Sequence, residues 1–229
     1  MIFKMFKKLL PMSIKKQMVN FYILAVKYGQ FKSIKRWECV NKDDENIPWY
    51  TYPAIEYLNN IDFSQKVIFE YGSGNSSTYW ASRAKAVYSV EDNKSWYEKI
   101  KSNLVKNQNI YLCENENDYL EAINKVPSKI DVVIIDGVYR EKCAKLIKGR
   151  LSDLAIVILD NSDWYKEASR YFREELDLIE VDFHGFGPIN NYTWTTSIFF
   201  ARNVKLTPVD NVQPNYSIAG IKSGDEKFN

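Results

Sequence analysis

The pattern with the clearest chemistry is a glycine turn that follows an apolar run. Residues 66–71 are mainly apolar, and Glu70 is followed by Gly72 and Gly74 before a polar segment that predicts a helix. Glycines let the backbone approach a ligand closely, and the first N–H groups of the following helix point toward that ligand. The turn therefore indicates a ligand-binding site at the end of a strand.

Three kinds of ligand bind such turns: a nucleoside triphosphate, a dinucleotide and S-adenosylmethionine. A triphosphate site needs Lys-Ser or Lys-Thr at the helix start, which this turn lacks. A dinucleotide would place its pyrophosphate beside the Glu70 carboxylate, and Ser77 stands where its third glycine is expected. S-adenosylmethionine carries an ammonium and a sulfonium, which Glu70 would attract directly or through water. The negative charge of Glu70 therefore favours S-adenosylmethionine over a nicotinamide dinucleotide.

A second acidic position supports an adenosine ligand. Glu91, followed by Asp92, ends the next β-branched run and lies 19 residues after Gly72. A carboxylate at about this spacing hydrogen-bonds ribose hydroxyls. Glu91 fits either adenosine ligand and does not discriminate between them, and the alternative is that Glu70 and Glu91 are simply polar strand ends.

These residues need a scaffold that brings several strand ends to one edge. From Lys66 onward, short β-branched runs alternate with charged helical stretches, which predicts βα units and a parallel sheet. Only ten residues, 185–194, separate the last two strands, which is too short for a helical crossover, so the last strand should be antiparallel. The predicted strands are Val67–Tyr71, Ala86–Glu91, Asn109–Cys113, Ile130–Asp136, Leu154–Asp160, Leu178–His184 and Thr195–Arg202. The predicted helices between them are Ser76–Arg83, Lys94–Lys106, Asp118–Asn124, Arg140–Gly149 and Asp163–Leu176.

With these elements assigned, residues 66–202 resemble the class I (Rossmann-like) S-adenosylmethionine-dependent methyltransferases. The first motif of that family is acid-x-Gly-x-Gly-x-Gly, and here it is Glu70-Tyr-Gly72-Ser-Gly74-Asn-Ser76, with serine for the third glycine. The resemblance implies an α/β fold, a doubly wound, mostly parallel seven-stranded sheet with an antiparallel last strand and helices on both faces. It also implies cofactor contacts to the methionine part from Glu70, Gly72, Gly74 and Ser76, to the ribose from Glu91 with Asp92, and to the adenine from Glu116 with Asn117.

A narrower resemblance concerns the fourth and fifth strands. They end in Asp136-Gly137 and Asp160-Asn161, which looks like the metal-dependent O-methyltransferases of the catechol and caffeoyl-CoA type. That likeness implies one divalent ion held by Asp136, Asp160 and Asn161, and such hard oxygen ligands suit magnesium, calcium or manganese. The ion would lower the pKa of a substrate hydroxyl, with Asp136 as a catalytic residue. The alternative is that Asp136 and Asn161 cap helices or bind substrate without metal.

Two further side chains could act on a substrate. His184, the only histidine, ends the sixth predicted strand at the edge where the ligand should lie, and an imidazole is a natural general base near neutral pH. His184 is therefore a predicted catalytic residue, with ordinary packing as the alternative. Arg140 would bind a carboxylate or phosphate of the substrate, or else pair with Glu141 or Asp163.

Charge is distributed unevenly along the chain. Nine of the 31 Lys and Arg residues lie in residues 1–36, which contain no acid, so the rest of the chain holds 22 basic against 29 acidic side chains. Pro11 should divide this basic arm into two helices. The arm could cover apolar surface of the protein's own domain, lie on an anionic membrane or bind a partner. Nucleic acid is not an expected partner, because the acidic main body would repel phosphates.

The cysteines and the hydropathy indicate a compartment. Cys39, Cys113 and Cys143 are odd in number and form no C-x-x-C pattern, which is typical of reducing conditions. No apolar run reaches the roughly 18–20 residues of a membrane helix. We expect a cytoplasmic protein, peripheral to the membrane if the arm binds lipid.

The expected organisation is a basic helical arm and lid at 1–65, an S-adenosylmethionine-binding domain at 66–204 and a tail at 205–229. The expected function is O-methylation of a small molecule or sugar, so the expected partner is a small-molecule or glycan substrate. A non-catalytic nucleotide-binding scaffold of the same fold and an NAD-dependent oxidoreductase are the alternatives. The sequence leaves the oligomeric state open.

Overall fold

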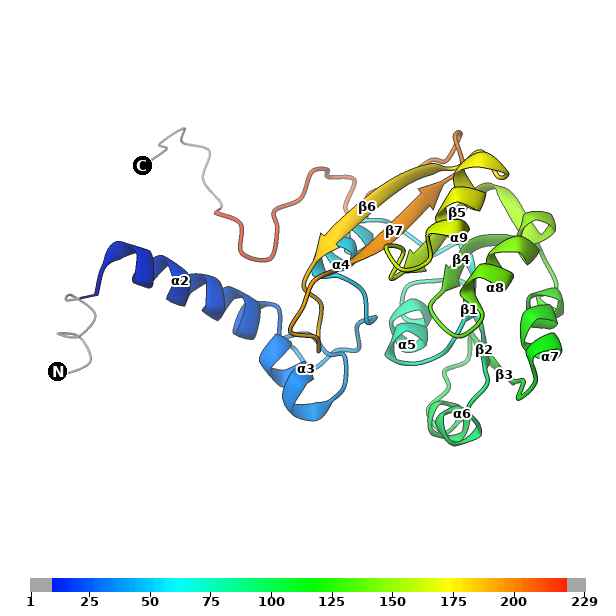
Figure 1. Ribbon diagram of the computed structural model, residues 1–229, viewed down its shortest axis with the longest axis horizontal. Helices are drawn as coiled ribbons and strands as arrows, with labels where there is room; N and C mark the ends of the chain where they lie inside the picture. The colour runs from blue at the N-terminus through cyan, green and yellow to red at the C-terminus, as the bar shows by residue number, and fades with distance from the viewer. Residues whose placement is uncertain (1–9, 222–229) are drawn as a thin grey trace.

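A seven-stranded sheet forms the centre of the computed structural model, which describes residues 10–221 (Figure 1). The strand order is β3-β2-β1-β4-β5-β7-β6, and β7 is antiparallel to both of its neighbours while the other pairs are parallel. The predicted α/β fold with an antiparallel last strand is confirmed. The strands are β1 (Val67–Tyr71), β2 (Ala86–Glu91), β3 (Gln108–Leu112), β4 (Ile130–Ile135), β5 (Leu151–Asp160), β6 (Ile179–Gly185) and β7 (Trp194–Phe200).

The central strands are buried on both faces because nearly every residue in them is apolar. In β4, Val132 and Ile134 pack into one core, and Val133 and Ile135 into another on the opposite face. The first core is covered by α4 (Tyr52–Asn59) and α5 (Asn75–Ala81). The second is covered by α7 (Glu116–Glu121), α8 (Arg140–Leu146) and α9 (Lys166–Glu174). The sheet is thus a middle layer whose parallel strands end on a common edge.

Several helices are shorter than the sequence pattern predicts. The helices α7 and α8 pass into short 3₁₀ turns, Ala122–Lys125 and Lys148–Arg150, instead of continuing as α-helix. The helix α6 (Lys94–Lys101) ends at Ser102, whose hydroxyl donates a hydrogen bond back to the Lys99 carbonyl oxygen. Local hydrogen bonds set where these helices end, and the spacing of apolar residues along the sequence does not predict those bonds.

The N-terminal arm is helical but stands apart from the sheet. It comprises α2 (Met12–Tyr22), a π-helical turn (Ile23–Lys27) and α3 (Gln30–Arg36). Pro11 precedes α2, as its helix-breaking role predicts, and the helix expected before Pro11 lies outside the described residues. No residue of α2 is buried, and the helix projects away from the body (Figure 1). The expectation that the arm covers the domain's own surface is therefore wrong for α2. None of the helices between residues 10 and 221 is long and apolar enough to cross a bilayer.

The segment after the arm belongs to the core. Residues from Cys39 to Phe63, including the fully buried Tyr50 and Leu58, pack with the first face of the sheet. Leu24 and Tyr28 also pack against this core, so the described part of the predicted 1–65 unit that is separate from it is α2. Further on, the described part of the tail contacts the end of α4, where the Asp62 amide donates to the Thr207 carbonyl oxygen at 2.8 Å.

Candidate functional site

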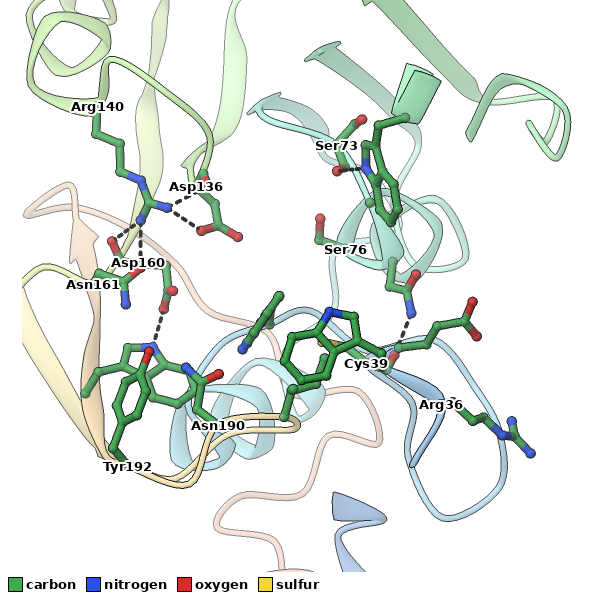
Figure 2. Close-up of a pocket in the computed structure, with 18 of the residues that line it drawn as sticks. Arg36, Cys39, Ser73, Ser76, Asp136, Arg140, Asp160, Asn161, Asn190 and Tyr192 are labelled. Atoms are coloured by element: carbon green, nitrogen blue, oxygen red, sulfur yellow. Dashed lines mark hydrogen bonds and ion pairs between the residues drawn. The ribbon is translucent and has the colours of Figure 1, made fainter. Parts of the chain in front are cut away.

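Two neighbouring cavities open at the edge where β1, β2, β4 and β5 end. The small cavity has a volume of about 200 Å³, and the large cavity about 750 Å³. Both are lined by Ser73, Ser76, Trp96 and Asp136, which therefore form the boundary between them. Figure 2 shows Asp136 approaching from one side of the large cavity and Ser73 and Ser76 from the other. Ligand sites at this edge are the general rule for open α/β sheets.

Glu70 lines the small cavity from the end of β1 and is almost fully buried. Its carboxylate accepts a hydrogen bond from the Ser89 hydroxyl at 3.0 Å, and it is 1% exposed. Burial raises the pKa of Glu70 to about 7, although hydrogen bonds from Ser77, Ser76 and Ser89 oppose this shift. A buried carboxylate with so little neutralising charge fits a cationic ligand group.

The turn after β1 depends on glycine for a reason that the sequence did not reveal. Gly72 has a φ of 106°, and a Cβ there would lie 3.0 Å from backbone atoms of Gly137. The turns after β1 and β4 therefore touch through two glycines. This contact sets the floor of the small cavity.

Glu91 lies at the end of β2 with its carboxylate held in place. It accepts hydrogen bonds from the Ser73 hydroxyl at 2.7 Å and from the Asn93 amide at 3.0 Å. The Trp96 indole donates to the Ser73 carbonyl oxygen at 2.8 Å and so fixes the glycine turn from outside. Burial raises the pKa of Glu91, and hydrogen bonds from Ser73 and Asn93 oppose the rise. Asp92 lines the same cavity beside Glu91.

The guanidinium of Arg140 joins the ends of β4 and β5. It forms an ion pair with the Asp136 carboxylate at 3.1 Å and donates to the backbone oxygens of Asp136, Gly137 and Asp160. It also donates to the side-chain oxygen of Asn161 at 3.1 Å (Figure 2). Arg140 thus pairs with Asp136 and not with Glu141 or Asp163, and its side chain is only 11% exposed. Burial raises the pKa of Asp136, and the neighbouring Arg140 charge counteracts that rise.

Asp160 is held deeper, with its carboxylate turned toward β7. One carboxylate oxygen accepts hydrogen bonds from the Trp194 indole at 3.0 Å and the Thr196 hydroxyl at 2.5 Å. Burial raises the pKa of Asp160 to about 8, and the negative charge of Asp136 adds to the effect. Burial and the neighbouring Asp136 charge thus both favour the neutral form of Asp160.

The predicted divalent-metal site does not fit this arrangement. Of its three predicted ligands, Asp136 and Asn161 direct oxygens at the Arg140 cation, and Asp160 binds Trp194 and Thr196. Each of the three side chains thus has an oxygen that is already engaged, and a divalent ion placed among them would lie beside a guanidinium, which repels it. Within residues 10–221, no group of three or more His, Cys, Asp or Glu side chains is placed to hold a metal ion.

The large cavity has an aromatic lining. Five of the six tryptophans of the chain border it, and Trp37 and Trp164 are 70% and 60% exposed. Tyr192 and Asn190 add a phenol and an amide on the loop between β6 and β7. Large apolar side chains at a cavity mouth indicate a surface that a ligand covers.

Three predicted site residues lie away from both cavities. Glu116 and Asn117 begin α7, and Glu116 forms an exposed ion pair with Lys142 at 2.5 Å. His184 hydrogen-bonds the Thr195 hydroxyl at 2.7 Å and lines a separate cavity with Lys166 and Arg173. The structure thus brings neither the predicted adenine contacts nor the predicted histidine base to Asp136. For His184 the reason is topology, because β6 is the outermost strand of the sheet.

Sequence reasoning named Arg140 but not the contacts that it makes, and it did not identify Trp96 as a residue that shapes the site. The clamp of Arg140 across two strand ends and the support of Trp96 under the turn are both tertiary contacts. The signal available was the position of Arg140 at the start of α8, only four residues after Asp136 at the end of β4, which keeps the two side chains close together. Nothing in the sequence indicated that the tryptophans line one cavity, because they come from segments far apart in the chain.

Comparison with solved structures identifies the fold. A Staphylococcus aureus protein provisionally assigned as a caffeoyl-CoA O-methyltransferase superposes with a TM-score of 0.52 at 16% identity, covering 81% of this chain and 98% of that one. A precorrin-6y C5,15-methyltransferase from Geobacter metallireducens superposes with a TM-score of 0.51 at 14% identity, covering 65% and 86%. No family model and no curated protein sequence matches the chain. The chain has the Rossmann-like fold of class I S-adenosylmethionine-dependent methyltransferases, and at these identities the likeness concerns the fold alone.

Proposed function

We propose that the chain is an S-adenosylmethionine-dependent methyltransferase that acts on a hydroxyl of a small molecule or sugar. The observation that carries the proposal is the shared boundary of the two cavities. In this proposal the cofactor occupies the small cavity and the acceptor occupies the large one. The methyl group would then cross at Asp136, which lines both.

The charges around the small cavity favour this cofactor over a dinucleotide. Glu70, Glu91 and Asp136 all line it, and its lining residues include no basic side chain. With Asp92, a pyrophosphate would meet four carboxyl groups there, whereas the ammonium and sulfonium of S-adenosylmethionine carry the complementary charge. Glu70 would bind the ammonium, and Glu91 would accept hydrogen bonds from the ribose hydroxyls.

The residues at the boundary could perform the transfer without further groups. The bound cofactor supplies an electrophilic methyl group on a positively charged sulfur. The acceptor oxygen forms a bond to the methyl carbon while the carbon–sulfur bond breaks and its electrons stay on sulfur. Asp136 takes the hydroxyl proton, and Arg140 orients its carboxylate by the 3.1 Å ion pair. Alignment of the two reactants in adjoining cavities contributes most of the rate.

The lining of the large cavity supports a sugar as the acceptor. Sugar rings present flat C–H faces that stack on aromatic rings, and their hydroxyls need polar partners at fixed positions. Trp37, Trp49 and Trp164 provide such faces, and Asn161 and Asn190 provide amides. That the acceptor is not a nucleic acid stays a prediction, supported by the acidic balance of the chain after residue 36.

A transfer assay tests the proposal and its metal independence together. The full chain is incubated with methyl-labelled S-adenosylmethionine and a panel of free sugars, sugar nucleotides and catechols, with magnesium or with EDTA. We expect label on a sugar oxygen and equal rates in both buffers, because Arg140 already engages Asp136 and Asn161, two of the three predicted metal ligands. Transfer only to catechols would contradict a sugar as the acceptor, and transfer only with magnesium would contradict metal independence. Cofactor binding without transfer to any acceptor would favour the non-catalytic scaffold.

A further inference from the structure

The arm displays apolar side chains that nothing between residues 10 and 221 covers. In α2, Met12, Met18 and Phe21 are 65%, 53% and 71% exposed, and in α3 Phe31 is 62% exposed. Soluble proteins rarely leave such a series of large apolar groups uncovered, so the arm has a partner outside this part of the chain.

The arm is amphipathic in a way that fits an interface. Ile14, Met18 and Phe21 follow the i, i+4, i+7 spacing and share one side of α2, and the exposed Val19 and Tyr22 extend the apolar surface beyond that side. Lys16 and Asn20 follow the i, i+4 spacing on the opposite side. A helix with an apolar side and a lysine-bearing side lies in the plane of a lipid interface.

The charge of the arm selects the kind of partner. Residues 1–36 contain no acid, and Lys15, Lys16, Lys27 and Lys35 form no ion pair with any residue between 10 and 221. A second copy of this arm would bring like charges together, which disfavours self-association. An anionic lipid surface offers both the opposite charge and an apolar layer.

We propose that α2 and α3 dock on an anionic lipid bilayer and hold the protein at its surface. The base of the arm is fixed to the body, because the side-chain amide of Gln30 donates to the Gly187 carbonyl oxygen at 2.9 Å. Gly29 has a φ of 84°, and a Cβ there would lie 2.6 Å from backbone atoms of Asn41. The arm is therefore anchored at its C-terminal end, and its free part is α2.

The arm ends at the mouth of the large cavity. Arg36 closes α3, Trp37 follows it with 70% of its surface exposed, and both line that cavity. Docking would hold this mouth near the lipid surface, so the acceptor would be a molecule carried at that surface. This last step alone rests on the proposed methyltransferase function, whereas lipid binding is measured without cofactor or acceptor.

The proposal is tested by vesicle flotation of the full chain. We expect the protein to float with vesicles of phosphatidylcholine and phosphatidylglycerol, not with phosphatidylcholine alone, and to dissociate in high salt. Each lysine near the surface contributes about a fivefold change in affinity, so Lys15→Glu with Lys16→Glu should weaken binding by about 25-fold or more. The control is Lys145→Glu with Lys148→Glu, which makes the same charge change on exposed lysines in and after α8 and should bind as the wild type does.

A second measurement reports insertion of the apolar side. The native cysteines are buried, so Met18→Cys can be labelled with an environment-sensitive fluorophore. Its emission should increase on anionic vesicles, whereas the same label on Ser102→Cys after α6 should not respond. Equal flotation with both kinds of vesicle, equal weakening by the two lysine pairs, or an unresponsive label at residue 18 would each overturn the proposal. An arm that dimerises and ignores lipid would overturn it as well.

Discussion

At the scale of single residues, the site is organised around one cation and several buried carboxyl groups. Arg140 contacts Asp136, Asn161 and three backbone oxygens, so it uses its donors on the protein itself. A guanidinium provides several donors in a fixed plane and stays charged, which suits it to hold two strand ends together. Arg140 is therefore a positioning residue, and Asp136 is the group available to an acceptor.

The role of Asp136 predicts a specific kinetic defect. Asp136→Asn removes the proton acceptor while preserving the size of the side chain, so kcat for the sugar acceptor should fall by about 100-fold or more. KM for the acceptor should change little. The matched control, Asp153→Asn at the exposed start of β5, should leave both constants unchanged. If the variant instead raises KM and leaves kcat unaltered, Asp136 acts in substrate binding alone.

Glu70 predicts how cofactor affinity depends on pH. Its pKa is about 7, and only the ionised form attracts a cation, so affinity for S-adenosylmethionine should rise as pH increases through 7. The ionised fraction implies binding about 20-fold weaker at pH 5.5 than at pH 7.5. Glu70→Gln should bind weakly at both pH values and lose this dependence. Titration calorimetry at the two pH values measures the affinity. If the affinity of Glu70→Gln still depends steeply on pH, Glu70 is not the origin of the pH dependence.

At the scale of elements, the contact between the turns after β1 and β4 holds the site together. Gly72 and Gly137 approach so closely that a methyl group at either position collides with the other turn or, for Gly137, with Tyr119. This contact explains why both positions are glycine without invoking the ligand.

That contact predicts a loss of stability. Gly72→Ala adds a Cβ at a φ of 106° and 3.0 Å from Gly137, and should lower the free energy of unfolding by about 1–3 kcal/mol. Gly149→Ala is the control, because a Cβ there meets nothing within 4 Å. Urea unfolding of both variants measures the difference. Equal stability of the two would mean that the turns relax apart freely.

The elements also explain what the sequence could predict. The strands were predictable because runs such as residues 131–136 are apolar at nearly every position, and the length of the last loop fixed the direction of β7. The C-terminal ends of α7 and α8 were not predictable, because each helix changes there into a 3₁₀ turn. Glu70, Gly72 and Glu91 lie at the small cavity as their motif implied, whereas His184 was misplaced because strand order is not visible in sequence.

At the scale of the whole molecule, burial of carboxyl groups at the site affects stability. The pKa of Glu70 is raised from 4.5 to about 7 and that of Asp160 from 3.8 to about 8. Between pH 5 and 8 the folded protein therefore holds protons that the unfolded chain has released. The free energy of unfolding must then fall as pH rises through this range.

This linkage predicts that the apo protein melts at a lower temperature at pH 8 than at pH 5.5. The exposed carboxyl groups with lowered pKa values, Asp44, Asp62 and Asp177, act below this range and do not offset it. Asp160→Asn should reduce the difference, because it removes one of the titrating groups while its amide oxygen can still accept from Trp194 and Thr196. Differential scanning calorimetry at the two pH values measures the difference in Tm. A Tm that rises with pH would contradict the raised pKa values of Glu70 and Asp160.

The projecting arm is the part of the whole molecule that pattern reasoning could not place. Its amphipathic sequence fits a helix lying on protein as well as one lying on lipid, and only the position of α2 distinguishes them. The uneven charge was visible in the sequence, but the free apolar side was not.

The central claim is that the small cavity binds S-adenosylmethionine and not a nicotinamide dinucleotide. Its most direct test is calorimetric titration of the full chain with S-adenosylhomocysteine and, in parallel, with NADH. We predict one site of micromolar affinity for the first, weakened at least tenfold by Glu91→Ala and unchanged by Glu98→Ala on the exposed side of α6, and no binding of NADH. Binding of NADH alone, or of neither compound, would contradict the claim.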